Sequence, residues 1–303
     1  MTLREMNDPI VVARDGSGQF TTVQEAVDRL PDYSETPVTI SIKNGVYREK
    51  LVVPQSKTNV RFVGESRDGT VLVNSDNAHT PGDDGQPLGT FRSASVFVYG
   101  DRFAAERLTI QNDSGQGTGQ AVAAFVQSDK AVFRDVTFLG YQDTLYTAEG
   151  RQYYENCRIE GDVDFIFGAA TAVFDRCVIH SKRSGSYLTA ASTPPERRFG
   201  YVFLDCRITG DPGVKDVYLG RPWRPHASVA FIRTWMDGLV IPAGWHNWRD
   251  PEREKTARYA EYDSRGPGAA PQARVGWSRQ LSEREAAEYD AGAVLGGDDG
   301  WRP

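Results

Sequence analysis

Two aspartates occupy the same position in consecutive repeats of this 303-residue sequence. Six segments share an apolar, polar, polar, small-or-apolar, polar, apolar pattern. Their leading residues are Ala105, Phe133, Tyr154, Phe174, Phe203 and Phe231. Asp143 lies 10 residues after Phe133, and Asp164 lies 10 residues after Tyr154. If the repeats stack, these two carboxylates are neighbours.

Adjacent carboxylates can act as a proton donor and a nucleophile. Two like charges this close cannot both ionise freely, so one pKa should rise while the other stays low. Acyl transfer and glycoside hydrolysis both require that division of roles. A single Asp near a turn is more often a capping or turn residue. Gln142 directly precedes Asp143, and Phe165 and Phe167 follow Asp164, which favours the catalytic interpretation.

The elements that position these residues follow from the spacing of the segments. Successive leading residues are 28, 21, 20, 29 and 28 residues apart, which is typical of one solenoid turn per repeat. The alternation predicts a strand with one buried face in each segment. No helix-period stretch between segments could supply an ordinary parallel-sheet crossover. We therefore predict an all-β fold, a right-handed parallel β-helix, with Asp143 and Asp164 α-carbons about 4.8 Å apart.

The two ends of the solenoid are expected to carry short helices. Thr22 and Glu25 have the spacing of a capping box and precede a stretch with helical periodicity. Ser282 and Glu285 repeat that arrangement near the other end. Because the first and last turns of a repeat protein must be covered, we expect both helices to act as caps.

Length, composition and charge indicate a single domain over residues 1–303, without a Gly/Ser/Pro linker. Residues 1–10 lack the pattern of a signal peptide, and no apolar run is long enough to span a membrane. A net charge of −6 and a pI near 5.4 argue against a nucleic-acid partner. We expect a monomer.

Three cysteines also fall in register, because Cys157, Cys177 and Cys206 each follow a leading aromatic residue by three positions. Stacked α-carbons about 4.8 Å apart lie within the disulfide range of about 4.4–6.8 Å. A disulfide between Cys157 and Cys177 and a ladder of buried thiols are therefore both open. No paired CxxC occurs and His180 stands alone, so no zinc site is predicted. We expect no metal or cofactor.

Five sequence blocks resemble the signature blocks of the pectin methylesterases, in that family's order. They are G45-V-Y-R-E49, G119-Q-A-V-A123, Y141-Q-D-T-L-Y146, D164-F-I-F-G168 and L219-G-R-P-W223. The resemblance covers nearly the whole chain. It implies a right-handed parallel β-helix that hydrolyses the methyl ester on galacturonate units of homogalacturonan, the pectin backbone, and releases methanol. It also implies secretion, although without a visible signal peptide an intracellular location stays open.

The same resemblance assigns roles to individual residues. It implies that Asp164 is the nucleophile and Asp143 the general acid/base. Arg221 matches the arginine that hydrogen-bonds the nucleophilic carboxylate, which keeps such a group ionised and oriented. Gln120 and Gln142 match two amides that stabilise the tetrahedral oxyanion, and such donors can contribute roughly 3–4 kcal/mol each.

Aromatic residues should line the groove, because sugar rings present apolar faces. The candidate substrate-binding residues are Thr90, Phe91, Tyr146, Phe167, Trp223 and Trp245. By resemblance, Trp223 and Phe167 are the first candidates for sugar contact. For Phe91 and Trp245, packing beneath a loop is an equally good interpretation of the sequence.

Other functions are weighed against this one. No GxSxG motif occurs, which argues against a serine hydrolase of the nucleophile-elbow type. A β-helix lyase or glycoside hydrolase on acidic polysaccharide would also display clustered carboxylates. A polysaccharide-binding solenoid without activity, or a relative acting on another ester or thioester, are further alternatives. Methanol with proton release would mark the esterase, and chain scission would mark a lyase or glycoside hydrolase.

Overall fold

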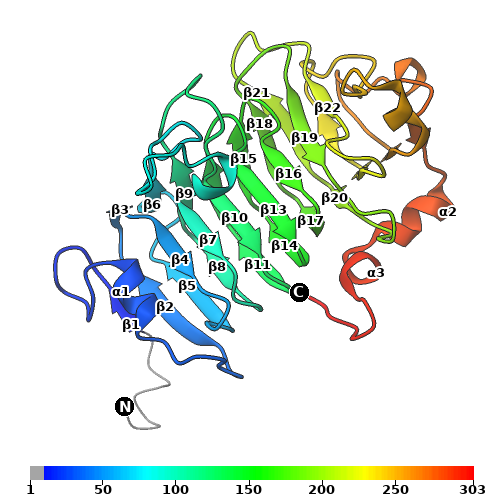
Figure 1. The fold of residues 1–303 in the computed structure, drawn as a ribbon. Helices are drawn as coiled ribbons and strands as arrows, with labels where there is room; N and C mark the ends of the chain where they lie inside the picture. The colour runs from blue at the N-terminus through cyan, green and yellow to red at the C-terminus, as the bar shows by residue number, and fades with distance from the viewer. Residues whose placement is uncertain (1–9) are drawn as a thin grey trace.

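The computed structural model describes residues 10–303, and its strands form three parallel sheets wound into a solenoid (Figure 1). Residues 1–9, most of the stretch in which no signal peptide was seen, lie outside the described residues. Within the described part, no helix has the length and apolar character needed to cross a membrane. The predicted parallel β-helix is confirmed.

The three sheets have eleven, seven and eight strands. The eleven-stranded sheet contains β1 (Ile10–Val12), β2 (Val38–Ile42), β5 (Val60–Gly64), β8 (Ala104–Glu106), β11 (Ala131–Arg134), β14 (Arg151–Glu155), β17 (Thr171–Asp175), β20 (Tyr201–Leu204), β23 (Ser228–Ile232), β25 (Arg258–Tyr262) and β26 (Arg279–Gln280). The seven-stranded sheet contains β4 (Leu51–Val53), β7 (Val96–Val98), β10 (Ala124–Gln127), β13 (Leu145–Glu149), β16 (Ile166–Gly168), β19 (Tyr187–Ala191) and β22 (Tyr218–Gly220). The eight-stranded sheet contains β3 (Gly45–Arg48), β6 (Thr70–Asn74), β9 (Thr109–Asn112), β12 (Thr137–Leu139), β15 (Arg158–Gly161), β18 (Val178–Ser181), β21 (Arg207–Gly210) and β24 (Trp235–Met236).

The leading residues of the repeats stack in the predicted register, one turn upon the next. Their aromatic rings lie nearly parallel, with centroids 4.9 Å apart for Phe133 and Tyr154 and 4.4 Å apart for Phe203 and Phe231. All of these rings are buried in the interior cluster of the solenoid. The column therefore forms the centre of the core.

Each repeat segment forms two strands, where the sequence pattern predicted one. In the segment that begins at Phe133, β11 ends at Arg134 and β12 begins at Thr137. Between them Asp135 has a φ of 53°, in the left-handed region. The equivalent residues of the other segments also have positive φ, namely Arg107, Asn156, Arg176, Asp205 and Arg233. Asp and Asn are enriched in this conformation and arginine is not, so the three arginine positions gave no signal for the bend.

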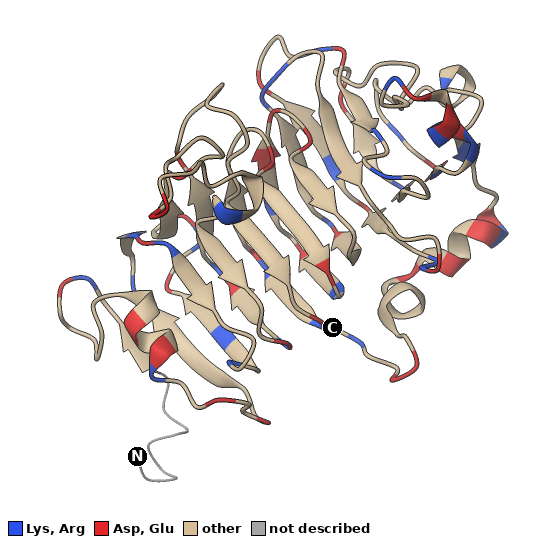
Figure 2. Cartoon of the chain, in the orientation of Figure 1, with Lys and Arg blue, Asp and Glu red and all other residues tan. Residues whose placement is uncertain are grey.

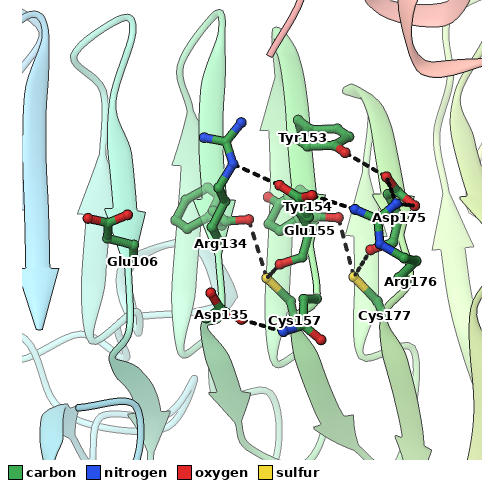
Figure 3. A network of polar contacts seen from close by, with 12 residues as sticks. Glu106, Arg134, Asp135, Tyr153, Tyr154, Glu155, Cys157, Asp175, Arg176 and Cys177 are labelled. Carbon is green, nitrogen blue, oxygen red and sulfur yellow. Dashed lines mark hydrogen bonds and ion pairs between the residues drawn. The ribbon is translucent and has the colours of Figure 1, made fainter.

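The three cysteines form a ladder of free, buried thiols. Each Sγ lies 3.5, 3.3 or 3.2 Å from the carbonyl oxygen of the leading aromatic residue in the preceding repeat, as Figure 3 shows for Cys157 and Cys177. Of the two interpretations left open by the sequence, the structure shows the thiol ladder, without a disulfide between these two cysteines.

The N-terminal helix caps the solenoid as predicted. Helix α1 (Val23–Asp28) begins after Thr22, whose side chain accepts a hydrogen bond from the backbone N–H of Glu25. Its apolar face belongs to the interior cluster, and the helix contacts β1, β2 and β4 at the first turns. Three short 3-10 helices lie in loops: η1 (Thr90–Arg92), η2 (Pro251–Lys255) and η3 (Pro271–Ala273).

The C-terminal helix forms as predicted but lies elsewhere. Helix α2 (Glu283–Ala286) has a complete capping box between Ser282 and Glu285. It continues into η4 (Ala287–Tyr289) and α3 (Ala291–Leu295). These helices cover the outer face of the eleven-stranded sheet, where α3 contacts β17.

The location of these helices has a simple physical reason. The outer face of the eleven-stranded sheet carries apolar residues such as Val173 and Ile232, which need cover. Ala286 and Leu295 pack against them. Trp277, in the loop before β26, packs against the interior core instead.

An ion-pair ladder lies on the strands of the eleven-stranded sheet (Figure 3). Glu155 accepts hydrogen bonds from Arg134, at 2.8 Å, and from Arg176. Asp175 accepts from Arg176 at 2.8 Å and from the hydroxyl of Tyr153 at 2.6 Å. In the view of Figure 2, acidic and basic residues are interspersed along the solenoid.

Candidate active site

The two aspartates lie at equivalent positions of neighbouring turns, just before β13 and β16. Leu145 pairs with Ile166, and the backbone N–H of Asp143 donates to the carbonyl of Val163 at 3.0 Å. Asp143 and Asp164 have φ values of 65° and 50°, a left-handed conformation that Asp tolerates better than most residues. The register therefore brings the two carboxylates together.

Arg221 holds one of the two carboxylates. Its Nε donates to Oδ1 of Asp164 at 2.9 Å, and its Nη2 donates to Oδ2 at 2.6 Å. This bidentate contact fixes the carboxylate in the plane of the guanidinium. Arg221 directly follows β22, and its backbone N–H bonds the carbonyl of Thr189 in β19. The fold therefore brings the arginine to Asp164 from two turns further along the solenoid.

The two carboxylates differ in electrostatic environment. Burial raises the pKa of Asp143 well above its ordinary value, and the charge of Asp164 raises it further, with Arg221 opposing both effects. Burial also raises the pKa of Asp164, against the hydrogen bonds and positive charge of Arg221. The prediction that one pKa stays low is therefore wrong for Asp164. Only this carboxylate has a bound cation, so it is the group better able to ionise.

A third carboxylate was missed by the sequence analysis. Asp162 is only 2% exposed, and its Oδ1 has no hydrogen-bond partner within residues 10–303. Its charge contributes to the raised pKa of Asp143. In the sequence, Asp162 stands two positions before Asp164. That spacing does not show whether the side chain of Asp162 is buried or exposed.

The two glutamines face the same cleft as the aspartates. Gln142 precedes Asp143, and its backbone carbonyl accepts a hydrogen bond of 3.1 Å from the backbone N–H of Ala121 on the neighbouring turn. That bond places Gln120 beside Gln142. Both side chains are partly exposed, so their amide groups can reach a bound ligand.

The cleft has a volume of about 430 Å³ and lies on the outer face of the seven-stranded sheet. Its lining consists of Thr90, Phe91, Gln120, Gln142, Asp143, Asp164, Phe167, Ala190, Arg221, Trp223 and Trp248. All five residues predicted for catalysis are among them, together with four of the six predicted for substrate binding.

Aromatic side chains form one wall of the cleft. The ring of Phe91 lies 6.3 Å from that of Trp223, and the ring of Phe167 lies 5.8 Å from it. Tyr146 packs against Phe91 at 5.2 Å and against Phe167 at 4.6 Å without lining the cleft itself. Phe91 is 48% exposed, so of its two possible roles the structure favours contact with a ligand.

Trp245 does not line the cleft, so its prediction as a groove residue is wrong. It is 1% exposed and stacks on Tyr259 at 4.3 Å inside the core. Its backbone pairs with Gly220, which continues the sheet and turns the side chain inward. Trp248 lines the cleft instead, because its φ of 63° folds the loop back over Arg221. Sequence order does not reveal which of two nearby tryptophans faces the solvent.

No group of three or more His, Cys, Asp or Glu residues is arranged to hold a metal ion in the described part of the chain. The groups that face the cleft are carboxylates, a guanidinium, amides and aromatic rings. Such a set can polarise a carbonyl, supply a nucleophile and donate a proton. The fold is thus a parallel β-helix, and its cleft holds the kinds of group that a carboxylate-based hydrolase needs.

Comparisons with known proteins identify the family. The family model for pectinesterases matches residues 9–298. Pectinesterase 31 from Arabidopsis thaliana is 41% identical over 282 residues, which are 92% of this chain and 89% of that protein. A pectin methylesterase from carrot superposes with a TM-score of 0.89 at 37% identity, covering 96% of this chain and 94% of the carrot chain. The chain belongs to the pectinesterase family.

A third relative has a saccharide in its structure. It is described as a pectin methylesterase in complex with hexasaccharide VII, and it superposes with a TM-score of 0.83 at 33% identity. The match covers 97% of this chain and 98% of that chain. The likeness therefore extends over the whole solenoid, including the turns that carry the cleft.

Proposed function

We propose that this protein is a pectin methylesterase, which hydrolyses the methyl esters of galacturonate units in homogalacturonan and releases methanol. The observation that carries the proposal is the unequal pair of carboxylates, in which Arg221 binds Asp164 and leaves Asp143 as the group with the strongly raised pKa. Family membership supports the substrate class. The relative bound to a hexasaccharide supports a polysaccharide ligand.

In the first half of the reaction, the ionised Asp164 attacks the carbonyl carbon of the methyl ester. The carbonyl oxygen becomes an oxyanion, and the amides of Gln120 and Gln142 donate hydrogen bonds to it. When the tetrahedral intermediate collapses, the C–O bond to methoxide breaks and Asp143 donates its proton to form methanol. The galacturonate is then joined to Asp164 as an anhydride.

In the second half, Asp143 is ionised and acts as a base. It takes a proton from a water molecule that attacks the acyl carbon, and the same two amides stabilise the second oxyanion. Collapse of this intermediate returns the carboxylate of Asp164 and releases a galacturonate acid. Asp143 ends protonated, as it began.

The aromatic wall orients the polymer. The rings of Phe91, Phe167 and Trp223 converge on one side of the cleft, and the two carboxylates lie in the same cleft. Sugar rings that pack on these apolar surfaces are held in place without an ionic contact. We therefore expect neutral, methylated stretches to bind at least as well as charged ones.

The proposal also accounts for residues that the alternatives leave without a role. A glycoside hydrolase needs two carboxylates but has no evident use for two glutamine amides in the same cleft. A lyase needs a base that abstracts a carbon-bound proton, and the one basic residue that lines the cleft, Arg221, is a guanidinium cation already bound to Asp164. Acyl transfer uses all five polar groups.

Release of methanol from highly methylated pectin tests the proposal. We expect the wild type to release methanol, and Asp164→Asn to lose roughly 10⁴-fold or more in rate, because an amide cannot serve as the nucleophile. Asp205→Asn is a matched control, because Asp205 also has a positive φ, 51°, but lies at a distant bend. Its rate should match the wild type.

Two outcomes would contradict the proposal. Methanol release by Asp164→Asn within tenfold of the wild type would remove Asp164 from the role of nucleophile. Shortening of the polymer without methanol release would favour a lyase or glycoside hydrolase instead.

A further inference from the structure

The column of equivalent positions that contains the two aspartates continues into an aromatic residue. Ile166, two residues after Asp164, pairs with Thr189, two residues after Tyr187. Tyr187 then pairs with Tyr218 on the next turn. The backbone N–H of Asp164 donates to the carbonyl oxygen of Tyr187 at 2.9 Å. Tyr187 is therefore the direct neighbour of Asp164 on the side away from Asp143.

The ring of Tyr187 contacts the cation that binds Asp164. The guanidinium carbon of Arg221 lies 3.8 Å from the centroid of the Tyr187 ring and 3.8 Å from the centroid of the Trp248 ring. Two rings at this distance cannot share one face of a planar group, so they enclose the guanidinium between them. Trp248 lines the cleft, whereas Tyr187 does not.

Tyr187 is itself held by its neighbours. Its ring stacks on Tyr218 with centroids 5.4 Å apart and an interplanar angle of 18°. His246 meets the edges of both rings at 5.3 and 5.2 Å. The ring of Tyr187 therefore has little freedom to move away from Arg221.

We propose that Tyr187 is a positioning residue for the reaction, which aligns the nucleophile Asp164 with the guanidinium of Arg221. Its carbonyl oxygen holds the backbone of Asp164, and its ring holds the plane of Arg221. This proposal rests on the proposed function only in calling Asp164 the nucleophile, because the alignment of Arg221 with Asp164 is a property of the free protein. Nothing in the sequence signatures singles out this tyrosine.

The physical reason lies in the geometry of the bidentate contact. Both hydrogen bonds form together only when the guanidinium and the carboxylate share a plane. An aromatic face fixes that plane and attracts the positive charge through its quadrupole, which an aliphatic side chain cannot do. Because burial raises the pKa of Asp164 and Arg221 opposes this shift, a misaligned arginine should leave Asp164 harder to ionise.

Other titratable and charged groups surround Asp164 and Arg221, and the variants used in the test leave all of them in place. They are Asp143 from the preceding turn, Asp162 from the same turn as Asp164, His246, Arg249 and Arg253 from the loop that carries Trp248, and Tyr259 from β25. Since a substitution of Tyr187 changes none of them, a change in the titration of Asp164 reports on Arg221.

The test compares Tyr187→Leu with Tyr187→Phe in protein labelled with ¹³C at the aspartate carboxyl carbons. The resonance of Asp164 is assigned by its loss in Asp164→Asn. Both variants keep the backbone carbonyl, and only Phe keeps the aromatic face. We expect the titration midpoint of Asp164 to match the wild type in Tyr187→Phe and to rise by roughly one pH unit in Tyr187→Leu.

Methanol release provides the second measurement. In Tyr187→Leu the turnover number should fall roughly 10- to 100-fold, with KM within about threefold, and the acid limb should move to higher pH. Tyr187→Phe should stay within about threefold of the wild type. If Tyr187→Leu does not fold, Tyr187→Met, which is unbranched and flexible, takes its place.

An unchanged Asp164 midpoint in a folded Leu or Met variant would overturn the inference, as would equal losses in the Phe and Leu variants. Failure of the proposed function would give a different experimental result. In that case the wild type releases no methanol, while the carboxyl titration still shows whether Tyr187 aligns Arg221 with Asp164.

Discussion

The eleven-stranded sheet and the seven-stranded sheet both carry charged side chains on their outer faces, but the charges are arranged differently. On the eleven-stranded sheet, acidic and basic side chains alternate, so that Glu155 lies between Arg134 and Arg176 (Figure 3). On the seven-stranded sheet, Asp143 and Asp164 stack as like charges. Arg221 bonds only one of them.

This difference shows how a solenoid can build an active site. Because like positions stack from turn to turn, a column repeats whatever residues the sequence places there. Exposed unlike charges in a column contribute little, about 0–1 kcal/mol per pair. Buried like charges destabilise each other and shift pKa values. The stack of Asp143 and Asp164, which destabilises the fold, is therefore the one whose side chains are suited to catalysis.

The two faces also differ in what covers them. Helices α2 and α3 pack on the apolar part of the eleven-stranded sheet. Loops rise at the edges of the seven-stranded sheet instead and leave a cleft of about 430 Å³. The chain thus covers one face with its C-terminal segment and leaves the other accessible to a polymer.

Replacing the cation of the site should have the largest effect on this comparison. We expect Arg221→Met to lower methanol release roughly 10³-fold or more, because Asp164 loses its bidentate partner. Since Arg221 opposes the upward pKa shift of Asp164 and activity needs that group ionised, the acid limb should move to higher pH. The pH profile is measured on a neutral, fully methylated oligogalacturonide.

Arg134→Met is the matched control, because it removes a guanidinium from the paired ladder instead. Its pH profile should coincide with that of the wild type. An acid limb in Arg221→Met that coincides with the wild-type limb would show that the ionisation of Asp164 does not depend on Arg221.

Removing an amide from the site should have the next largest effect. We expect Gln142→Ala to lower the turnover number roughly 10²- to 10³-fold with little change in KM, because an oxyanion donor acts mainly in the transition state. Gln127→Ala, at the exposed end of β10 in the same sheet, should leave both constants unchanged. A change in KM alone would place Gln142 in ground-state binding.

Neutralising the third carboxylate should have a smaller effect that appears mainly in the pH profile. The charge of Asp162 contributes to the raised pKa of Asp143, so Asp162→Asn should lower that pKa. Asp143 must be protonated to donate, so the basic limb of kcat/KM should move to lower pH. The rate at the optimum should change only several-fold. A basic limb that stays in place, or moves to higher pH, would show that the charge of Asp162 does not raise the pKa of Asp143.

The smallest effect is expected in the paired ladder. Arg134 is 40% exposed as a side chain, and its pair with Glu155 is one of several such contacts. Arg134→Met should therefore lower the free energy of unfolding by no more than about 1 kcal/mol. Chemical denaturation checks this value. A loss of several kcal/mol would mean that the ladder is as strongly coupled as the site.

Much of the site could be predicted from local sequence. The shared offset of Asp143 and Asp164 from their leading aromatic residues set their register, and the structure shows that register. The aromatic wall could be predicted in part, since Phe167 and Trp223 line the cleft. It could not be predicted that Trp248 lines the cleft in place of Trp245, because this depends on a loop conformation in which Trp248 has a φ of 63°. The bend could be predicted only in part, since Asp135 is a residue type that favours positive φ, whereas three of the six equivalent positions are arginines.

The sequence by itself determined the column order, since parallel stacking repeats each position at one spacing and the apolar pattern specifies which face is buried. Only the tertiary structure decided what surrounds each column. Arg221 meets Asp164 across 57 residues of chain, and Tyr187 and Trp248 enclose it from separate turns. Burial and pKa are sums over all such neighbours, so they exist only after the turns and loops have come together.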